Sequence, residues 1–294
     1  MAKPKMLLIT STGLVGGNIR RVLDAQGCDV VQTYYPSVDK PQGLPVDISS
    51  KLSVQELFEK VSPSIVILNA ALTNVEFCQE NRDIAWKINV TGTQNVASAC
   101  KDCKSKLVFF SSDYVFDGQA GPYLETDAPH PINVYGETKL AAELFIQDAL
   151  DDYLVIRTTI VYGYEALAKN FCYRLINTLK AGQQIKVPND QRGSPTYAYN
   201  LAEVVVNLIE KNNKGLYNVV GKEVVDRYEF ARRVCAVFGL DEKLLVPVAT
   251  RELNQKAPRP LKAGLRIDKV SRDSSVAIMG IDDSLRAFKK ELYG

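Results

Sequence analysis

The sequence predicts an α/β fold built on a doubly wound parallel sheet, and three observations carry this prediction. Short apolar runs without polar alternation recur along the first 160 residues, as expected of strands buried on both faces of a sheet. Segments with amphipathic helical periodicity separate these runs. A glycine-containing turn joins the first apolar run to the first helical segment. Such alternation is typical of a parallel sheet covered by helices on both faces.

The elements follow in chain order. We expect strands at 5–10, 29–34, 65–68, 107–111 and 154–158, and helices at 14–26, 53–61, 82–101 and 134–149. Beyond residue 158 the alternation fails, and we expect helices at 170–181, 199–210, 226–238 and 283–292 between irregular stretches at 187–197 and 250–271. We therefore expect a Rossmann-like domain over 1–160, on which a return segment near 192–220 packs, and a smaller C-terminal α/β lobe over 161–294.

Length and composition narrow the class of protein. A chain of 294 residues is longer than one core usually needs, and 46% hydrophobic with 24% charged residues is ordinary for a soluble globular protein. The formal net charge of +2, without a Lys/Arg block, argues against nucleic acid or a membrane surface as partner. No signal or anchor segment is recognisable, so we expect a cytoplasmic protein with reduced cysteines. His130 is the single histidine, which excludes a His-based metal site or a Ser-His triad.

The turn after the first predicted strand carries a phosphate-binding pattern. Residues 11–16 read STGLVG, which has the G-x-G-x-x-G spacing with Ser11 in the first position. Glycines at such a strand-to-helix turn let the backbone approach a pyrophosphate, which the helix N-terminus attracts. The alternative is a plain tight turn between a strand and a helix.

The end of the second predicted strand bears on cofactor choice. It reads Gln32-Thr33-Tyr34-Tyr35, without the carboxylate that binds the ribose 2′-hydroxyl in NAD-preferring sites. We therefore predict NADPH, with Thr33, Ser37 or Lys40 near a 2′-phosphate, and keep NADH as the alternative.

A second polar group of residues falls further along the chain. Ser112 follows an apolar run, and Tyr135 and Lys139 are four residues apart in a predicted helix, so they share one face. A nearby ammonium lowers the pKa of a phenol and makes it a better proton donor. Ser11, Asn69 and Ser112 follow parallel strands, so we expect them at one rim of the sheet. A solvated helix face is the alternative for the Tyr-Lys pair.

Together these motifs resemble the dTDP-4-dehydrorhamnose reductase family of the extended short-chain dehydrogenase/reductase superfamily, over nearly the whole chain. The resemblance is carried by LLITSTGLVG, by ILNAALTNVEFCQENRDIAWKINVTGTQNVA at 67–97, by FFSSDYVFDG, by NVYGETKLAAE and by VPNDQRGSPTYAYNLAE at 187–203. It implies reduction of the C4 ketone of a dTDP-linked 6-deoxyhexose by NAD(P)H, giving dTDP-L-rhamnose, with the C-terminal lobe binding the substrate.

The resemblance also implies residue roles. Tyr135 would protonate the ketone oxygen, Lys139 would bind the nicotinamide ribose, and Ser112 would hydrogen-bond the carbonyl oxygen. The remaining cofactor residues would be Ser11, Gly13, Leu14, Val15 and Gly16 at the diphosphate, Asp47 and Ile48 at adenine, and Asn69, Ala70 and Ala71 beside the cofactor. The substrate side would comprise Thr73, Asp113, Tyr114, Val115, Ile160 and Gln191, with Arg192, Arg259 and Lys262 as candidates for the nucleotide diphosphate. Asn89 would hold the catalytic helix or a water in place.

The chain departs from the family pattern at two points. Ser11 stands where the superfamily has glycine, in a turn one residue shorter than usual, and RTTIVYG replaces the common RTSWVYG, so Ile160 stands in place of an aromatic residue. Another nucleotide-sugar reductase or epimerase therefore stays an alternative. So does a non-catalytic NADP-binding subunit resembling the regulatory subunit of methionine adenosyltransferase. Some family members use Mg²⁺, for which no ligands are assigned here, and a homodimer would be the commonest closed arrangement.

Overall fold

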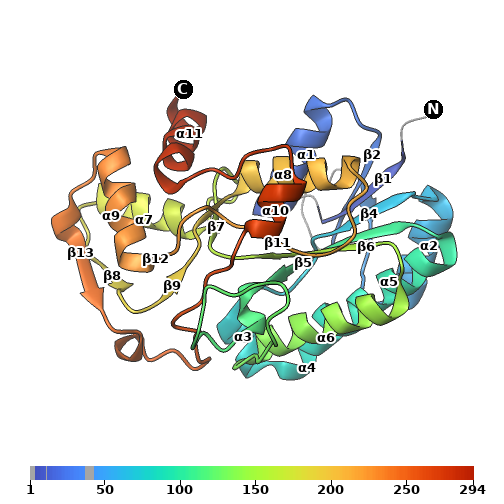
Figure 1. Cartoon of the computed structure of the whole chain (residues 1–294), viewed down its shortest axis with the longest axis horizontal. Helices are drawn as coiled ribbons and strands as arrows, with labels where there is room; N and C mark the ends of the chain where they lie inside the picture. Colours follow the sequence, from blue (N-terminus) through green and yellow to red (C-terminus); the bar gives the residue numbers. More distant parts are fainter. Residues whose placement is uncertain (1–3, 11, 37–42) are drawn as a thin grey trace.

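A seven-stranded parallel sheet forms the centre of the protein. The computed structural model describes residues 4–10, 12–36 and 43–294. The strand order is β11-β6-β5-β4-β1-β2-β3, and every pairing in this sheet is parallel (Figure 1). The strands are β1 (Met6–Ile9), β2 (Val30–Tyr34), β3 (Leu44–Pro45), β4 (Ile65–Leu68), β5 (Lys106–Ser112), β6 (Tyr153–Thr158) and β11 (Gly215–Asn218). This confirms the predicted doubly wound fold, in which the strand order reverses between β1 and β4.

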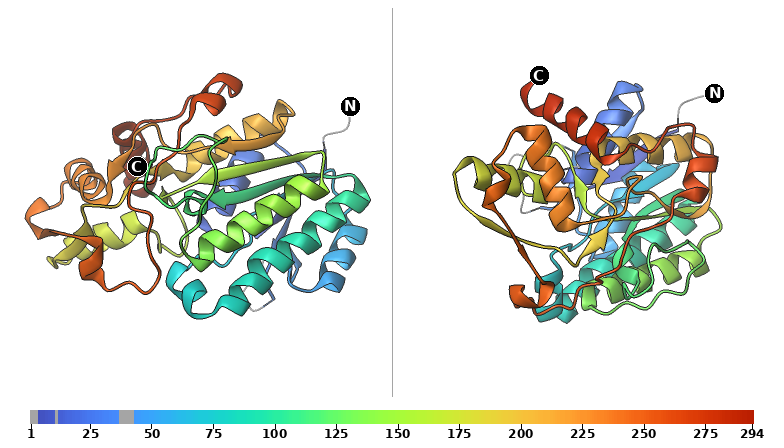
Figure 2. Two further views of the ribbon diagram at one scale, coloured as in Figure 1. Left: turned by 60° about the horizontal axis from the view of Figure 1, so that its bottom comes forward. Right: turned by 60° about the vertical axis from the view of Figure 1, so that its left-hand side comes forward.

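Helices cover both faces of this sheet. Figure 1 shows α1 (Leu14–Ala25), α8 (Ala198–Glu210) and α10 (Asp268–Asp273) on one face, and α2 (Lys51–Val61), α5 (Gly92–Cys103) and α6 (Val134–Ala149) on the other. In Figure 2, α5 and α6 run side by side along the sheet. A hydrophobic core lies on each face of the sheet, and strand β1 contributes side chains to both. Leu8 packs toward α1 and α8, while Leu7 and Ile9 pack toward α2 and α5. Burial on both faces explains why this strand reads as a continuous apolar run.

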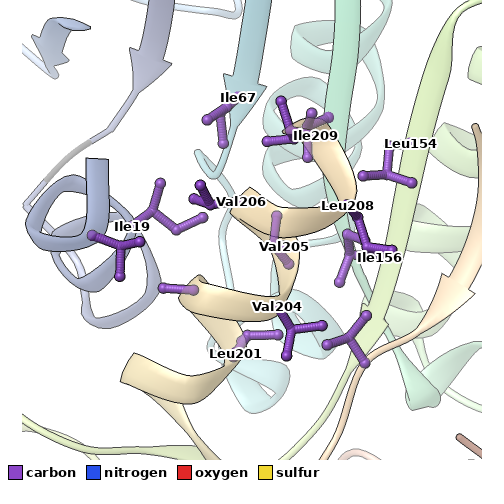
Figure 3. Close-up of a cluster of buried hydrophobic side chains, with 14 of the residues drawn as sticks. Ile19, Ile67, Leu154, Ile156, Leu201, Val204, Val205, Val206, Leu208 and Ile209 are labelled. Carbon is purple, nitrogen blue, oxygen red and sulfur yellow. The ribbon is translucent and has the colours of Figure 1, made fainter. Parts of the chain in front are cut away.

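Helix α8 returns to the sheet from the second half of the chain. Its side chains Leu201, Val205 and Ile209 belong to the same buried cluster as Ile67 and Ile156 from strands β4 and β6 (Figure 3). After α8 the chain adds β11 as an edge strand beside β6. No strand was predicted there, because the four residues GLYN contain no apolar run and are held in the sheet by pairing.

The predicted helix at 82–101 differs in detail. It consists of α4 (Arg82–Trp86), a π-helical turn η1 (Lys87–Thr91) and α5, and a short unpredicted helix, α3 (Val75–Glu80), precedes it. Asn74 caps α3 by accepting a hydrogen bond from the Phe77 N–H at 3.1 Å. Six residues are too few for a helical repeat to be read from sequence, and π-helical turns of this kind occur often at functional sites.

The remaining elements form a smaller lobe at one end of the sheet, on the left in Figure 1. Tyr162, Phe230 and Phe288 are fully buried in its core. Its helices are α7 (Phe171–Lys180), α9 (Arg227–Phe238) and α11 (Ile281–Tyr293). Its strands pair two by two: β7 (Val161–Tyr162) with β10 (Thr196–Tyr197), β8 (Ile185–Pro188) with β13 (Leu245–Val248), and β9 (Arg192–Gly193) with β12 (Val225–Asp226). Short 3₁₀ helices of the chain lie at η2 (Asp113–Val115), which directly follows β5, and at η3 (Glu242–Leu244) and η4 (Thr250–Leu253).

Within the described ranges, no helix combines the length and apolar character needed to cross a membrane.

Candidate active site

A cleft of about 1050 Å³ opens at the carboxyl ends of the central strands. Thr10 follows β1, Asn69 follows β4, Ser112 ends β5 and Thr158 ends β6, and all four line this cleft. The expected meeting of strand ends at one rim is therefore observed for Asn69 and Ser112. Ser11, the third member of that prediction, lies outside the described residues.

The cleft suits a dinucleotide at its α1 end. Gly13 is the N-cap of α1 in an extended conformation, and no side chain caps this helix within the described part of the chain. The first-turn N–H groups of a helix attract phosphate, and Gly13, Leu14 and Val15 all line the cleft. The donors present therefore fit a nucleotide diphosphate. Asp47 and Ile48, expected near adenine, line the same cleft.

The structure gathers most of the predicted site residues and leaves some behind the cleft wall. Those that line the cleft are Gly13, Leu14, Val15, Asp47, Ile48, Asn69, Ala70, Ala71, Thr73, Ser112, Tyr114, Tyr135, Lys139 and Ile160. Those that do not are Gly16, Thr33, Asp113, Val115 and Gln191, each of which is buried.

The buried residues support the cleft from behind. Thr33 is fully buried, and its Oγ1 accepts a hydrogen bond from the Thr10 N–H at 3.1 Å, so it steadies the turn after β1 instead of reaching a cofactor phosphate. Gly16 is a buried position of α1, and Val115 packs in an apolar cluster with Phe116. Ser37 and Lys40, the other residues considered for a 2′-phosphate, lie outside the described residues.

Helix α6 brings Tyr135 to the cleft. Asn133 caps this helix by accepting a hydrogen bond from the Gly136 N–H at 2.9 Å. A Cβ at position 136 would lie 2.0 Å from the Tyr114 carbonyl oxygen, so the first turn of α6 can approach the segment after β5 only with glycine there. The Tyr114 ring packs edge-on against the Tyr135 ring at 5.7 Å between centroids.

The protonation states of Tyr135 and Lys139 differ from the sequence-based prediction. Burial raises the pKa of Tyr135 well above its usual value, while a hydrogen bond with Ser112 lowers it less. Burial also lowers the pKa of Lys139 to about 8, although Glu143 acts in the opposite direction. The Lys139 ammonium donates to the Phe110 carbonyl oxygen at 2.8 Å. The net pKa shift of Tyr135 is therefore upward in this structure, and burial is its largest cause. Tyr135 is a neutral phenol, the form that can donate a proton.

Ser112 connects Tyr135 to a buried carboxyl. The Ser112 hydroxyl donates to Asp113 Oδ1 at 3.2 Å and accepts from the Tyr114 N–H at 3.3 Å. Burial raises the pKa of Asp113 to about 6, while hydrogen bonds with Thr159 and Ser112 and the charge of Arg227 lower it less. The result is a polar chain that runs from Asp113 through Ser112 to Tyr135.

Asn89 connects helix α6 to the segment after β4. Its Oδ1 accepts from the Leu72 N–H at 2.7 Å, and its Nδ2 donates to the Leu72 carbonyl at 3.1 Å and to Thr138 Oγ1 at 3.1 Å. Thr138 in turn donates to the Tyr135 carbonyl at 2.8 Å. Asn89 is buried in the π-helical turn, and these bonds support the predicted structural role.

Ile160, the departure from the family pattern, lies on the cleft wall in an unusual conformation. Its φ is 44°, a value that β-branched residues rarely adopt. Its Cδ1 would lie 2.7 Å from a Cβ at position 193, so Gly193 makes room for this side chain. Backbone strain of this kind gathers at functional sites.

One cation that lines the cleft, Arg227, is not singled out by any sequence motif. Arg227 lines the cleft, whereas Arg192 and Lys262 are exposed elsewhere and Arg259 pairs with Glu76 at 2.8 Å. Gln191 does not line the cleft, and its Oε1 accepts from Arg227 Nε at 3.0 Å. Arg227 falls at the start of a predicted helix, and no local pattern marks it as facing a cleft formed by residues more than fifty positions away.

Two further observations complete the site. Lys169 and Asn170, just before α7, also line the cleft. Among residues 4–10, 12–36 and 43–294, no group of three or more His, Cys, Asp or Glu side chains is arranged to hold a metal ion.

Comparison with known proteins places these features in a family. The family described as "RmlD substrate binding domain" matches residues 4–293. The chain is 31% identical to the probable low-salt glycan biosynthesis reductase Agl14 of Haloferax volcanii over 286 residues, 95% of either chain. It is 30% identical to dTDP-4-dehydrorhamnose reductase of Escherichia coli over 306 residues, 98% of either chain. The crystal structure of dTDP-4-dehydrorhamnose reductase from Bacillus anthracis in complex with NADP superposes with a TM-score of 0.90 at 29% identity, covering 99% of this chain and 100% of that one. This chain therefore belongs to the RmlD substrate binding domain family.

Proposed function

We propose that this chain, an NAD(P)-dependent reductase of the RmlD family, reduces the C4 ketone of a nucleotide-linked deoxysugar. Our first candidate is the conversion of dTDP-4-dehydro-L-rhamnose to dTDP-L-rhamnose. The observation that carries the proposal is a neutral Tyr135, hydrogen-bonded to Ser112, in a cleft that also opens on the N-terminus of α1. Two relatives with about 30% identity are themselves named as reductases.

The roles of the residues follow from this arrangement. The α1 N-terminus at Gly13 binds the cofactor diphosphate, with Asn69 beside it. When bound, the reduced nicotinamide supplies a hydride for the carbonyl carbon. Tyr135 gives its proton to the carbonyl oxygen, and the Ser112 hydroxyl turns from Asp113 to donate a hydrogen bond where negative charge develops. Lys139, fixed by its bond to the Phe110 carbonyl, binds the nicotinamide ribose.

Burial of the proton donor has a consequence for its charge. A phenol with a raised pKa stays protonated across the neutral range, so every resting molecule carries the proton that the reaction needs. Lys139, with a pKa of about 8, loses its charge at mildly alkaline pH. In our proposal, weaker binding of the cofactor above pH 8 therefore reflects Lys139 rather than Tyr135.

The activity is tested by mixing the protein with NADPH and dTDP-4-dehydro-6-deoxyhexoses and following the absorbance of reduced nicotinamide. Tyr135→Phe is expected to lower kcat by about 10²–10⁴-fold, because it removes a general acid. The affinity for NADPH should stay unchanged. Tyr293→Phe is the matched control, because Tyr293 is exposed at the end of α11 and away from the cleft. Equal rates for Tyr135→Phe and the unmodified protein would disprove the proton-donor role.

A second candidate is reduction of a different nucleotide sugar, and Ile160 favours it. An aliphatic side chain replaces the aromatic residue common in the family, so this wall of the cleft has another shape. A panel of dTDP-, UDP- and GDP-linked 4-ketosugars, compared by kcat/KM, separates the two candidates. The second candidate would be favoured if a dTDP-linked sugar of another configuration gave the highest kcat/KM.

For the cofactor we propose NADPH over NADH. The sequence QTYY at the end of β2 contains no carboxylate, and Tyr35, which lines the cleft, is 53% exposed. The homologue from Bacillus anthracis is described in complex with NADP. The ratio of kcat/KM for the two cofactors tests this choice, and equal values would contradict it.

A further inference from the structure

Arg227 is a cation of the smaller lobe, and it lines the cleft. It is the first residue of α9, directly after strand β12, which pairs antiparallel with β9. Its backbone N–H donates to the Gln191 carbonyl at 3.0 Å, and its Nε donates to Gln191 Oε1 at 3.0 Å. Gln191 is itself held, because its Nε2 donates to Thr250 Oγ1 at 3.0 Å. The direction of the guanidinium is therefore fixed before any ligand arrives.

The charge of Arg227 is not balanced by an ion pair with any residue that the structure describes. Across the described ranges, no carboxylate lies within 4.0 Å of its guanidinium, whereas Arg233 on the same helix pairs with Glu223 at 2.7 Å. Its charge acts on Asp113, which is buried and does not line the cleft. A partly buried cation with this surplus charge attracts an anion.

The position of Arg227 separates it from the cofactor groups. Its guanidinium carbon lies 5.7 Å from the centre of the Phe171 ring, at the start of α7 in the lobe. Its charge also acts on Tyr114, which packs against Tyr135. Arg227 thus borders the substrate side of the catalytic tyrosine, whereas the α1 N-terminus belongs to the sheet.

We propose that Arg227 binds the diphosphate of the nucleotide-sugar substrate and selects nucleotide-linked sugars over free ones. This inference rests on the proposed function. A planar guanidinium matches phosphate oxygens in pairs, which an ammonium does not, so arginine at this point favours a diphosphate over a neutral sugar. Arg192, Arg259 and Lys262, the cations expected there from sequence, do not line the cleft.

Binding of nucleoside diphosphates tests the inference without requiring turnover. Isothermal titration calorimetry with dTDP, UDP and GDP would be carried out on the full chain with NADP⁺ present. Arg227→Gln is expected to weaken the best of these ligands by about 10- to 100-fold, the usual effect of losing a charged hydrogen bond, and Arg227→Lys by less. NADPH affinity should change less than twofold. Arg232→Gln is the matched control, since Arg232 lies on the same helix, is exposed and pairs with Glu242.

The outcomes separate this inference from the proposed function. The inference is overturned if the Arg227→Gln variant binds the nucleoside diphosphate as tightly as the unmodified protein. It is also overturned if the variant loses affinity for NADPH by the same factor as for the nucleoside diphosphate, or if the unmodified protein binds none of the three nucleotides. Arginine-dependent dTDP binding without reduction of any ketosugar would support the inference while the proposed function fails.

Discussion

Asp113 allows a quantitative prediction about stability, because it is a carboxyl with 2% exposure and a pKa of about 6. Burial raises this pKa above the ordinary value of 3.8, so the neutral form is favoured in the folded protein. The stability associated with that form is fully present below pH 3.8 and is lost as the pH rises through about 6. At pH 8 the ionised carboxyl costs about 3 kcal/mol, since a tenfold change in an equilibrium constant corresponds to about 1.4 kcal/mol.

Asp113→Asn removes this pH-dependent cost and keeps an oxygen that accepts hydrogen bonds from Ser112 and Thr159. The free energy of unfolding of the variant, relative to the unmodified protein, should therefore rise by about 2.5 kcal/mol between pH 4 and pH 8. This corresponds to about 5 °C in Tm, at about 2 °C per kcal/mol for a chain of this size. Any cost of the buried amide that is independent of pH cancels in this comparison.

Urea unfolding, followed by circular dichroism at pH 4, 5, 6, 7 and 8, measures the effect. Asp152→Asn is the control: although burial alone would raise its pKa, the hydrogen bond and charge of Lys106 lower it. The stability from Asp152 is present above pH 3.8 and is lost only at lower pH. Asp152→Asn should thus be less stable than the unmodified protein by an amount that is constant between pH 5 and pH 8. A constant difference for Asp113→Asn as well would refute the reasoning.

Further predictions concern the support of the catalytic helix. Gly136→Ala should destabilise the protein by about 1–3 kcal/mol and reduce activity, because the added Cβ would meet the Tyr114 carbonyl oxygen at 2.0 Å; urea unfolding and NADPH oxidation check both effects. Arg157→Met should lower the free energy of unfolding by about 3–5 kcal/mol at pH 7, because it leaves Glu143, 1% exposed, as an unpaired buried charge. In calorimetric titrations, NADPH affinity should fall between pH 7 and pH 9 as Lys139, with its pKa of about 8, loses its proton; a flat profile would remove Lys139 from cofactor binding.

The sheet domain could be predicted from sequence because its signals are local. Apolar runs such as 65–68 and 107–111 match β4 and β5 closely, and the helical period over 134–149 matches α6 at both ends. Strand β11 could not be predicted, because GLYN becomes a strand only by pairing with β6. Helix α3 was missed because its six residues depend on the cap at Asn74.

The candidate site could be predicted where residues follow strands or share a helix face. Ser112, Tyr135 and Lys139 are gathered in one cleft for these reasons. Their ionisation could not be predicted, since burial depends on the packing of distant segments and here raises the pKa of the phenol and lowers that of the ammonium. Arg227 was missed for a related reason: two bonds to Gln191 aim it at the cleft, and no spacing in the sequence reveals them.

The most direct test of the central claim follows the transferred hydrogen. The protein is incubated with NADPH carrying deuterium at the transferable C4 position and with dTDP-4-dehydro-6-deoxyhexose, and the sugar product is examined by NMR spectroscopy and mass spectrometry. We expect one deuterium on C4 of the sugar, formed at a rate that Tyr135→Phe lowers by about 10²–10⁴-fold. Binding of NADPH without deuterium in any 4-ketosugar offered, or deuterium at another carbon, would contradict the proposed C4 ketone reduction.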